Sequence, residues 1–187
     1  MFRTRKRVFL LLAVLSIWLP GAAAFAATAA PKKQVGPRAG TTTSATPNRV
    51  VTRNCYRFEL DAQNRVVRVE GDLQLDPSQP RNQKAQLKAG GTDRKDDDDG
   101  GHYIGRRFKG PTDEFNHFAQ NLNLNRGEFK KLENAWERDL KAGRKVRVQI
   151  GPYFDNKSLR PEGLEVTFWV NGAADRRRFS NEPGGGR

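Results

Sequence analysis

The chain has 187 residues, 34 of them basic and 21 acidic, so its formal charge at pH 7 is +13. Residues 1–48 hold seven of the basic residues and no acidic one, which leaves +6 on residues 49–187. The single cysteine, Cys55, excludes an intrachain disulfide and a Cys/His zinc site, and we expect it to pack in a strand as a small apolar residue. The charge favours a polyanionic partner such as nucleic acid or an anionic envelope surface, although solubility alone also accounts for +6.

The N-terminus is typical of an exported protein. A basic start at residues 3–7 precedes the apolar run Val8–Leu19, which is too short for a comfortable membrane span. Ala24–Ala26 forms a small-x-small cleavage site, and Ala22–Ala24 would serve nearly as well. We therefore expect a signal peptide over residues 1–26, a secreted or periplasmic protein, and no stable membrane insertion after cleavage. An uncleaved anchor is the alternative.

Residues 27–48 are small and polar with several prolines and glycines, which predicts a disordered leader. Residues 49–187 are the size of one domain with a core of its own. In Val50–Leu75, alternating apolar residues predict two strands joined by a turn at Asp61–Asn64. The polar stretch Asp76–Asp97 is expected to be a long surface loop.

The second half of the domain predicts one helix and further strands. We expect a short strand around His102–Ile104, irregular structure over Pro111–Leu124 and one helix over Asn125–Ala142, whose apolar residues share a face. Alternating residues then predict strands in 145–154 and 164–172, with a third in 176–183. The result is an α+β domain, a sheet with one principal helix.

The segment Asp98–Phe108, DDGGHYIGRRF, carries the first candidates for catalysis. Phosphodiester hydrolysis at neutral pH needs a base for water, a cation for the developing charge and groups that orient the phosphate. His102 is the candidate base because the pKa of histidine lies near neutrality, and Arg106 and Arg107 are candidate phosphate ligands. A structural role for His102 is the alternative, and Asp96–Asp99 is expected to be a solvated turn.

A second segment, Phe115–Glu137, gathers asparagines and a glutamine ahead of the predicted helix. The amide oxygen of Asn125 is a hard ligand that suits Mg²⁺, which takes few protein ligands. Eight residues along a straight helix advance about 12 Å, so Asn125 and Glu133 cannot both bind one ion directly. A contribution of Glu133 to the same ion would need contact through water or an irregular helix at Gly127. Asn125 and Glu128 also form a capping box, which is compatible with metal binding.

Together the two segments resemble the DNA/RNA non-specific endonucleases of the ββα-metal fold, in the branch of secreted bacterial nucleases and toxin domains. The family's Asp-Arg-Gly-His motif corresponds to Asp99–His102, which reads Asp-Gly-Gly-His here. Its helix motif, Leu-Asn-(Arg/Gln)-Gly-x-(Trp/Phe)-x-x-(Leu/Met)-Glu, fits Leu124–Glu133 throughout. The resemblance covers about Tyr56 to Gly184 and implies an antiparallel sheet packed on one principal helix.

The resemblance implies a role for each matching position. His102 would be the general base, Asn125 the direct ligand of a single Mg²⁺ or Mn²⁺ ion, and Glu133 the holder of the ion's waters. Asn116 and Gln120 match the polar loop before the helix, although the family's proline is missing there, and Asp99 is expected to orient its loop. DNA and RNA are the implied substrates, cut with little sequence preference to give 5′-phosphate ends.

One departure from the family lies at Gly100, where many members have an arginine that contacts the phosphate. Arg106 or Arg107 is a candidate replacement. Arg138, one residue out of register, is a candidate for an arginine that some members place further along the helix. His117 is expected to be an ordinary loop histidine.

We therefore expect a secreted, Mg²⁺-dependent endonuclease of DNA and RNA. Two alternatives keep the fold. One is a non-catalytic nucleic-acid-binding protein, which the glycine at position 100 favours and which would show salt-sensitive binding without cleavage. The other is a toxin or effector nuclease that a small acidic immunity protein inhibits. A structural envelope-binding protein would leave the asparagine-rich motif unexplained.

Overall fold

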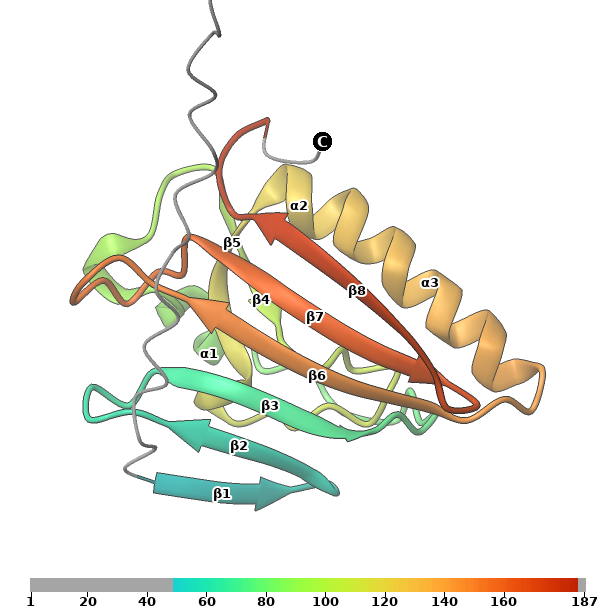
Figure 1. The fold of residues 1–187 in the computed structure, drawn as a ribbon. Coiled ribbons are helices and arrows are strands. Elements are labelled where there is room, and N and C mark those ends of the chain that lie inside the picture. The colour runs from blue at the N-terminus through green and yellow to red at the C-terminus, as the bar shows by residue number, and fades with distance from the viewer. Residues whose placement is uncertain (1–48, 185–187) are drawn as a thin grey trace, which may run out of the picture. The chain divides into compact units, whose positions relative to one another are not determined.

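The computed structural model describes residues 49–184, so the expected signal peptide and leader lie outside the described residues. A six-stranded antiparallel sheet in the order β1-β2-β3-β6-β7-β8 forms its largest element (Figure 1). Its strands are β1 (Arg49–Arg53), β2 (Tyr56–Leu60), β3 (Val66–Asp72), β6 (Val146–Tyr153), β7 (Gly163–Val170) and β8 (Ala173–Ser180). The expected α+β class with an antiparallel sheet is confirmed.

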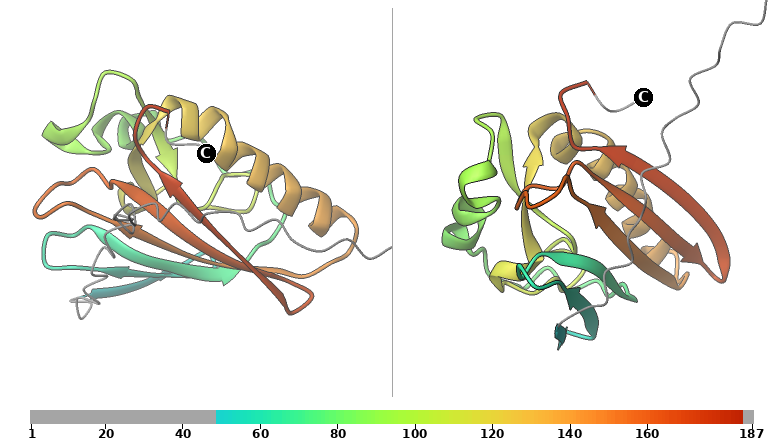
Figure 2. Two further views of the ribbon diagram at one scale, coloured as in Figure 1. Left: turned by 45° about the horizontal axis from the view of Figure 1, so that its top comes forward. Right: turned by 60° about the vertical axis from the view of Figure 1, so that its left-hand side comes forward.

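The remaining elements all cover one face of this sheet, as the edge-on view shows (Figure 2). They are α1 (Gln83–Lys88), β4 (Asp98–His102), β5 (His117–Asn121), α2 (Leu122–Arg126), α3 (Glu128–Lys141) and two 3-10 turns, Gly91–Asp93 and Glu114–Asn116. Strands β4 and β5 pair with each other as a separate two-stranded ribbon.

The core lies between the sheet and this second layer because alternate strand residues point inward. Phe129 and Trp136 of α3 are 2% exposed, and their rings contact Phe179 and Phe168 of the sheet edge to face. The two residues are seven positions apart, which is two helical turns, and this spacing predicts that they share the apolar face of the helix. The helix is therefore held firmly against β7 and β8.

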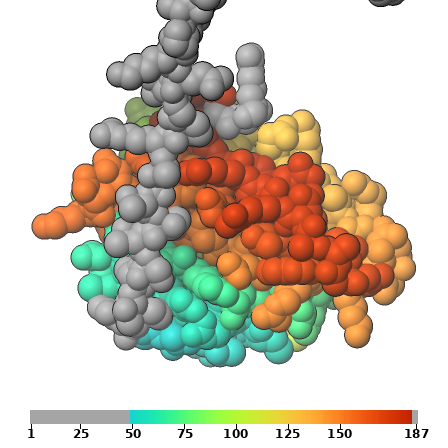
Figure 3. All heavy atoms as spheres, in the orientation of Figure 1, coloured from blue at the N-terminus to red at the C-terminus, as the bar shows by residue number. Residues whose placement is uncertain are grey.

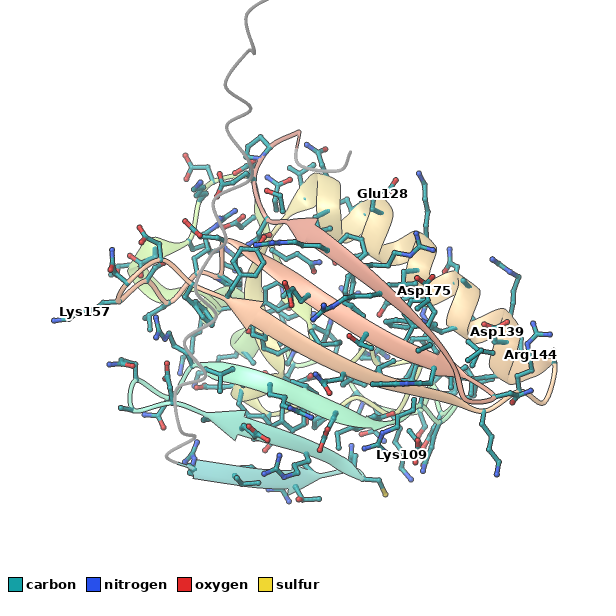
Figure 4. All side chains as sticks on the ribbon, in the orientation of Figure 1. Lys109, Glu128, Asp139, Arg144, Lys157 and Asp175 are labelled. Carbon is teal, nitrogen blue, oxygen red and sulfur yellow. The ribbon has the colours of Figure 1, made fainter. Side chains whose placement is uncertain are left out.

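The other face of the sheet is lined by paired charges. Arg68 Nη2 lies 2.9 Å from Glu70 Oε2 on β3, and Arg176 Nη2 of β8 lies 3.2 Å from Glu165 Oε2 of β7. In Figure 3 the side chains of β7 and β8 cover a large part of the surface on view. Figure 4 shows Asp175 on β8.

Two predictions for the N-terminal strands were wrong. Val50–Leu75 forms three strands rather than two because Asn54 and Cys55, with φ of 51° and 69°, make an additional tight turn between β1 and β2. Cys55 is exposed in this turn instead of packed in a strand. The turn at Asp61–Asn64 is confirmed, with a 3.0 Å bond from the Asn64 N–H to the Asp61 carbonyl.

Three further predictions need correction. The expected loop Asp76–Asp97 contains α1, which Asn82 caps by accepting the Ala85 N–H at 3.0 Å. The short strand is Asp98–His102 rather than His102–Ile104, because its glycines pair with β5 across the ribbon. The stretch expected to be irregular before the helix contains β5 itself. Among the described residues, no helix is long and apolar enough to cross a bilayer.

Candidate active site

His102 is the last residue of β4 and faces its pairing partner, His117 of β5. The two imidazole rings lie 4.7 Å apart between centroids, and His102 Nε2 lies 3.2 Å from the side-chain nitrogen of Gln86. Burial, with smaller contributions from His117, Arg106 and Arg81, lowers the pKa of His102 to about 4. The ring is therefore neutral at pH 7 and has a lone pair with which to accept a proton.

Asn125 lies near the end of α2, and Asp99 of β4 fixes its orientation. Asn125 Nδ2 donates to Asp99 Oδ2 at 2.8 Å. Arg126 donates to both oxygens of the same carboxylate, at 2.8 and 2.7 Å, and this bond holds the pKa of Asp99 below its usual range. An ionised carboxylate only accepts hydrogen bonds, so it selects the NH₂ group of Asn125 and turns the carbonyl oxygen away from itself. Asp99 thus orients Asn125.

The predicted single helix is broken at Gly127, which corrects the expectation of one helix over Asn125–Ala142. Gly127 has φ −105° and ψ −107° and separates α2 from α3. The expected capping box is absent from this helix start: Asn121 caps α2 by accepting the Asn123 N–H, and α3 begins without a side-chain cap. The break removes the objection that a straight helix places Asn125 and Glu133 too far apart.

Glu133, on α3, is the acid of the site, and its side chain is 15% exposed. Its carboxylate packs against Gly105, where a Cβ atom would collide with Glu133 Oε1. Burial raises the pKa of Glu133 to about 7, against the opposing effect of Arg107, whose Nη2 lies 3.8 Å from Glu133 Oε2. A carboxyl group with this pKa gains or loses a proton easily near neutrality.

These side chains converge on one cavity of about 320 Å³, which β4, the loop after it, α2 and α3 enclose. Five of the candidates from the sequence line it: His102, Arg106, Arg107, Asn125 and Glu133. They come from positions up to 31 residues apart in the chain. The other lining residues are Pro77, Gly105 and Phe129.

The two arginines of this cavity are held differently. Arg107 Nη1 donates to Asn134 Oδ1 at 2.7 Å and to Glu137 Oε2 at 2.8 Å, both on α3. Arg106 Nε donates to the Gln79 carbonyl at 2.8 Å. Among residues 49–184 its two terminal nitrogens have no hydrogen-bond partner. Arg106 is therefore the freer of the two to receive a phosphate.

The remaining candidates lie outside the cavity. Asn116 is fully buried and pins the loop after β4, because it accepts the Ile104 N–H at 3.0 Å and donates to the carbonyls of Ile104 and Pro111. Gln120 is buried beneath Gly101, and its amide has no partner among the described residues. Arg138 is exposed on α3 and does not line the cavity.

The sequence reasoning missed three residues around the site. His117 is buried in β5, with Nδ1 2.9 Å from the Asp113 carbonyl, rather than an ordinary loop histidine. Asp98, expected in a solvated turn, is buried and bound by Arg160 at 2.7 Å. Gln86 contacts His102 from α1. The sequence signal for this short helix is weak: a capping residue, Asn82, followed by Ala85 and Ala89 at helical spacing.

Comparison with solved structures supports the ββα-metal fold. NucA from Streptococcus agalactiae with a magnesium ion bound superposes with a TM-score of 0.57 at 16% identity, over 76% of this chain and 76% of that one. Sda1 nuclease with a bound zinc ion gives a TM-score of 0.56 at 13% identity, over 73% and 75%. These likenesses establish the fold.

The sequence comparison establishes the family. Residues 45–172 match the model of the DNA/RNA non-specific endonuclease family. The type VII secretion system protein EssD of Staphylococcus aureus is 34% identical over 131 residues, which are 67% of this chain and 21% of EssD. The chain thus spans about a fifth of the curated relatives that it matches. It belongs to the DNA/RNA non-specific endonuclease family.

Proposed function

We propose that this chain is an exported endonuclease that hydrolyses phosphodiester bonds of both DNA and RNA, with one divalent cation and with His102 as general base. The observation that carries the proposal is the convergence of His102, Asn125 and Glu133 on one cavity. They come from a strand and two helices that are separate elements in the chain. A base, a hard oxygen ligand and a carboxyl group that can hold the ion's waters are the parts that this chemistry uses.

The donor groups of the cavity fit a hydrated Mg²⁺ or Mn²⁺ ion. Asp99 turns the Asn125 carbonyl oxygen away from itself, and an amide oxygen suits a cation that keeps most of its water. Among the described residues, no three His, Cys, Asp or Glu side chains gather as a metal-binding cluster. When bound, the cation would supply positive charge to the phosphate and to the departing 3′ oxygen.

The chain's own side chains have distinct tasks in this proposal. His102 is neutral at pH 7 and takes the proton of the attacking water. Glu133, as a carboxylate, accepts hydrogen bonds from the waters around the ion. Arg106 uses Nε for Gln79 and keeps its terminal nitrogens for a phosphate oxygen, which compensates for the glycine at position 100.

The N-terminal sequence and the relatives support a setting outside the cytoplasm. A signal peptide over residues 1–26 and a leader over 27–48 would deliver the nuclease domain outside the cytoplasm. The match to a protein named for a type VII secretion system favours a second candidate, a toxin or effector nuclease with an acidic immunity protein as its partner. Expression of residues 27–187 in a cytoplasm tests this: growth arrest that a small acidic protein encoded next to the gene relieves would favour the toxin.

The activity test compares residues 27–187 with the variants His102→Ala and Arg138→Ala. Supercoiled plasmid and RNA are incubated with each protein, in Mg²⁺ or in EDTA. We expect cleavage by the parent and by Arg138→Ala only in Mg²⁺. Loss of a general base should slow His102→Ala by about 10²–10⁴-fold.

Two outcomes would contradict the proposal. A protein that retards the plasmid on a gel and never cuts it would be a binding protein on a nuclease fold. Equal cutting by the parent and by His102→Ala would remove His102 from the mechanism.

A further inference from the structure

Helix α1 brings a glutamine amide to the histidine of the active site. The side-chain nitrogen of Gln86 lies 3.2 Å from His102 Nε2. Gln86 does not line the cavity and lies 16 residues before His102 in the chain. It therefore approaches the ring from outside the cavity that the proposed substrate would enter.

The close approach of α1 depends on Gly100. A Cβ atom at this position would lie 2.5 Å from Gln86 Cβ and 2.6 Å from Gln86 Cα, closer than van der Waals contact allows. The backbone of Gln86 thus occupies the space that any side chain at position 100 would need. Gly100, the departure from the family's motif, and the contact between Gln86 and His102 are parts of one local arrangement.

Further bonds hold Gln86 in this place. Arg94 Nη1 donates to the Gln86 carbonyl at 2.6 Å, and Arg94 Nη2 donates to the Asp98 carbonyl at 2.7 Å, so one guanidinium joins α1 to β4. Asn82 caps α1 and also donates to the Thr112 carbonyl at 2.8 Å. These bonds fix the backbone of Gln86 beside β4, within reach of the His102 ring.

The tautomer of His102 decides which ring nitrogen carries the lone pair, and so whether the nitrogen that Gln86 leaves free can accept a proton. Among residues 49–184, Nδ1 of His102 has no hydrogen-bond partner, and Nε2 has only Gln86. A half-turn of the Gln86 amide exchanges its NH₂ group and its oxygen. If the NH₂ group of Gln86 faces Nε2, it donates to the Nε2 lone pair, and the ring proton lies on Nδ1. If the amide oxygen faces Nε2, it accepts the Nε2–H, and the lone pair on Nδ1 stays free.

We propose that Gln86 turns its amide oxygen toward His102, in place of the nitrogen that faces Nε2 in the structure. As a positioning residue it then accepts the Nε2–H of His102, fixes the orientation of the ring and leaves Nδ1 as the proton acceptor. This inference rests on the proposed role of His102 as general base. A neutral partner suits a ring that has to stay neutral among the charged or titratable groups that face it: His117 of β5, Arg106 of the following loop and Arg81 before α1. The glycine at position 100 permits this arrangement.

The kinetic test uses the whole chain with Gln86→Met, Gln86→Glu and the matched control Gln83→Met, whose parent residue is exposed on the same helix. Gln86→Met keeps the length of the side chain and loses the hydrogen bond. We expect its kcat to fall about 10- to 100-fold with little change in KM and in the urea midpoint, and Gln83→Met to match the parent. In Gln86→Glu the carboxylate also accepts Nε2–H, and it raises the pKa of the ring. The acid limb of the pH profile should therefore move to higher pH, and kcat should be restored above that limb.

A spectroscopic test reads the tautomer without any activity. The chain has only two histidines, so a long-range ¹H–¹⁵N spectrum contains two rings, and His117→Gln assigns them. The proposal requires Nδ1 of His102 to resonate as an unprotonated nitrogen in the parent, and a mixture of tautomers in Gln86→Met.

A protonated Nδ1 in the parent, a Gln86→Met variant as fast as Gln83→Met, or a Gln86→Glu variant as slow as Gln86→Met would each overturn the proposal. Failure of the proposed function looks different. His102→Ala would then cut as fast as the parent, while the spectrum would still report which nitrogen Gln86 holds.

Discussion

The variant Arg160→Met should destabilise the protein strongly because it strands a buried carboxylate. Arg160 donates to both oxygens of Asp98, the first residue of β4, at 2.7 and 2.9 Å. The two side chains are 5% and 0% exposed, so solvent screens the pair little. Removal of one partner from such a pair costs about 3–5 kcal/mol. This is a large share of a domain's usual stability of about 5–15 kcal/mol.

The measurement is urea unfolding of the parent, of Arg160→Met and of the double variant Asp98→Asn/Arg160→Met. The double variant removes the stranded charge and keeps an acceptor for the Lys95 N–H, 2.9 Å away, so it should be more stable than Arg160→Met alone. Arg177→Met breaks an exposed pair with Asp175 and should change the free energy of unfolding by less than about 1 kcal/mol. A loss for Arg160→Met as small as that of Arg177→Met would refute the reasoning.

Three further predictions concern the site. Binding of Mg²⁺ at pH 7 should release on the order of half a proton, because the pKa of Glu133 is about 7 without the ion and a cation favours the carboxylate. Calorimetry in buffers of different ionisation enthalpy measures the number of protons released. The variant Glu133→Gln should release none. Burial lowers the pKa of His102 to about 4, whereas the pKa of the same histidine in the unfolded chain is about 6.5. As the pH falls, the unfolded chain therefore binds a proton at His102 before the folded protein does. Up to about 3 kcal/mol of stability that is present above pH 6.5 should be lost as the pH falls toward 4. Unfolding curves of parent and His102→Gln that run parallel across this range would contradict this. Gly100→Ala should cost about 1–3 kcal/mol by pushing α1 off β4, and an unchanged urea midpoint would show that α1 adapts.

The break at Gly127 shows how far local sequence can predict the site. The apolar spacing of Phe129 and Trp136 correctly predicts a helix and its buried face. No proline interrupts Asn125–Phe129, so the sequence favours one straight helix. Whether a glycine continues or breaks a helix depends on the packing of the segments on either side of it. In a straight helix Asn125 and Glu133 lie too far apart to serve one ion, and the change of direction at Gly127 removes this difficulty.

Residues 83–88 show the opposite case, in which local signals were too weak. A six-residue helix has few periodic positions, so α1 disappears in a polar stretch that also contains prolines and glycines. The helix is held by Arg94 and by its contact with Gly100, and neither is a property of its own residues. Gln86 could therefore not be connected to His102 before the fold was known.

By itself the sequence determined the α+β class, the buried faces of the principal helix and of most strands, and the residues His102, Asn125 and Glu133 as candidates for chemistry. The class and the buried faces follow from short-range periodicity. The candidates follow from the donor chemistry of single side chains together with the resemblance of two segments to a nuclease family. The tertiary structure decided that the three side chains line one cavity, that Asp99 orients Asn125 and that Gln86 contacts the histidine. It also decided the pKa values of His102 and Glu133, because the burial that shifts them comes from elements distant in the chain.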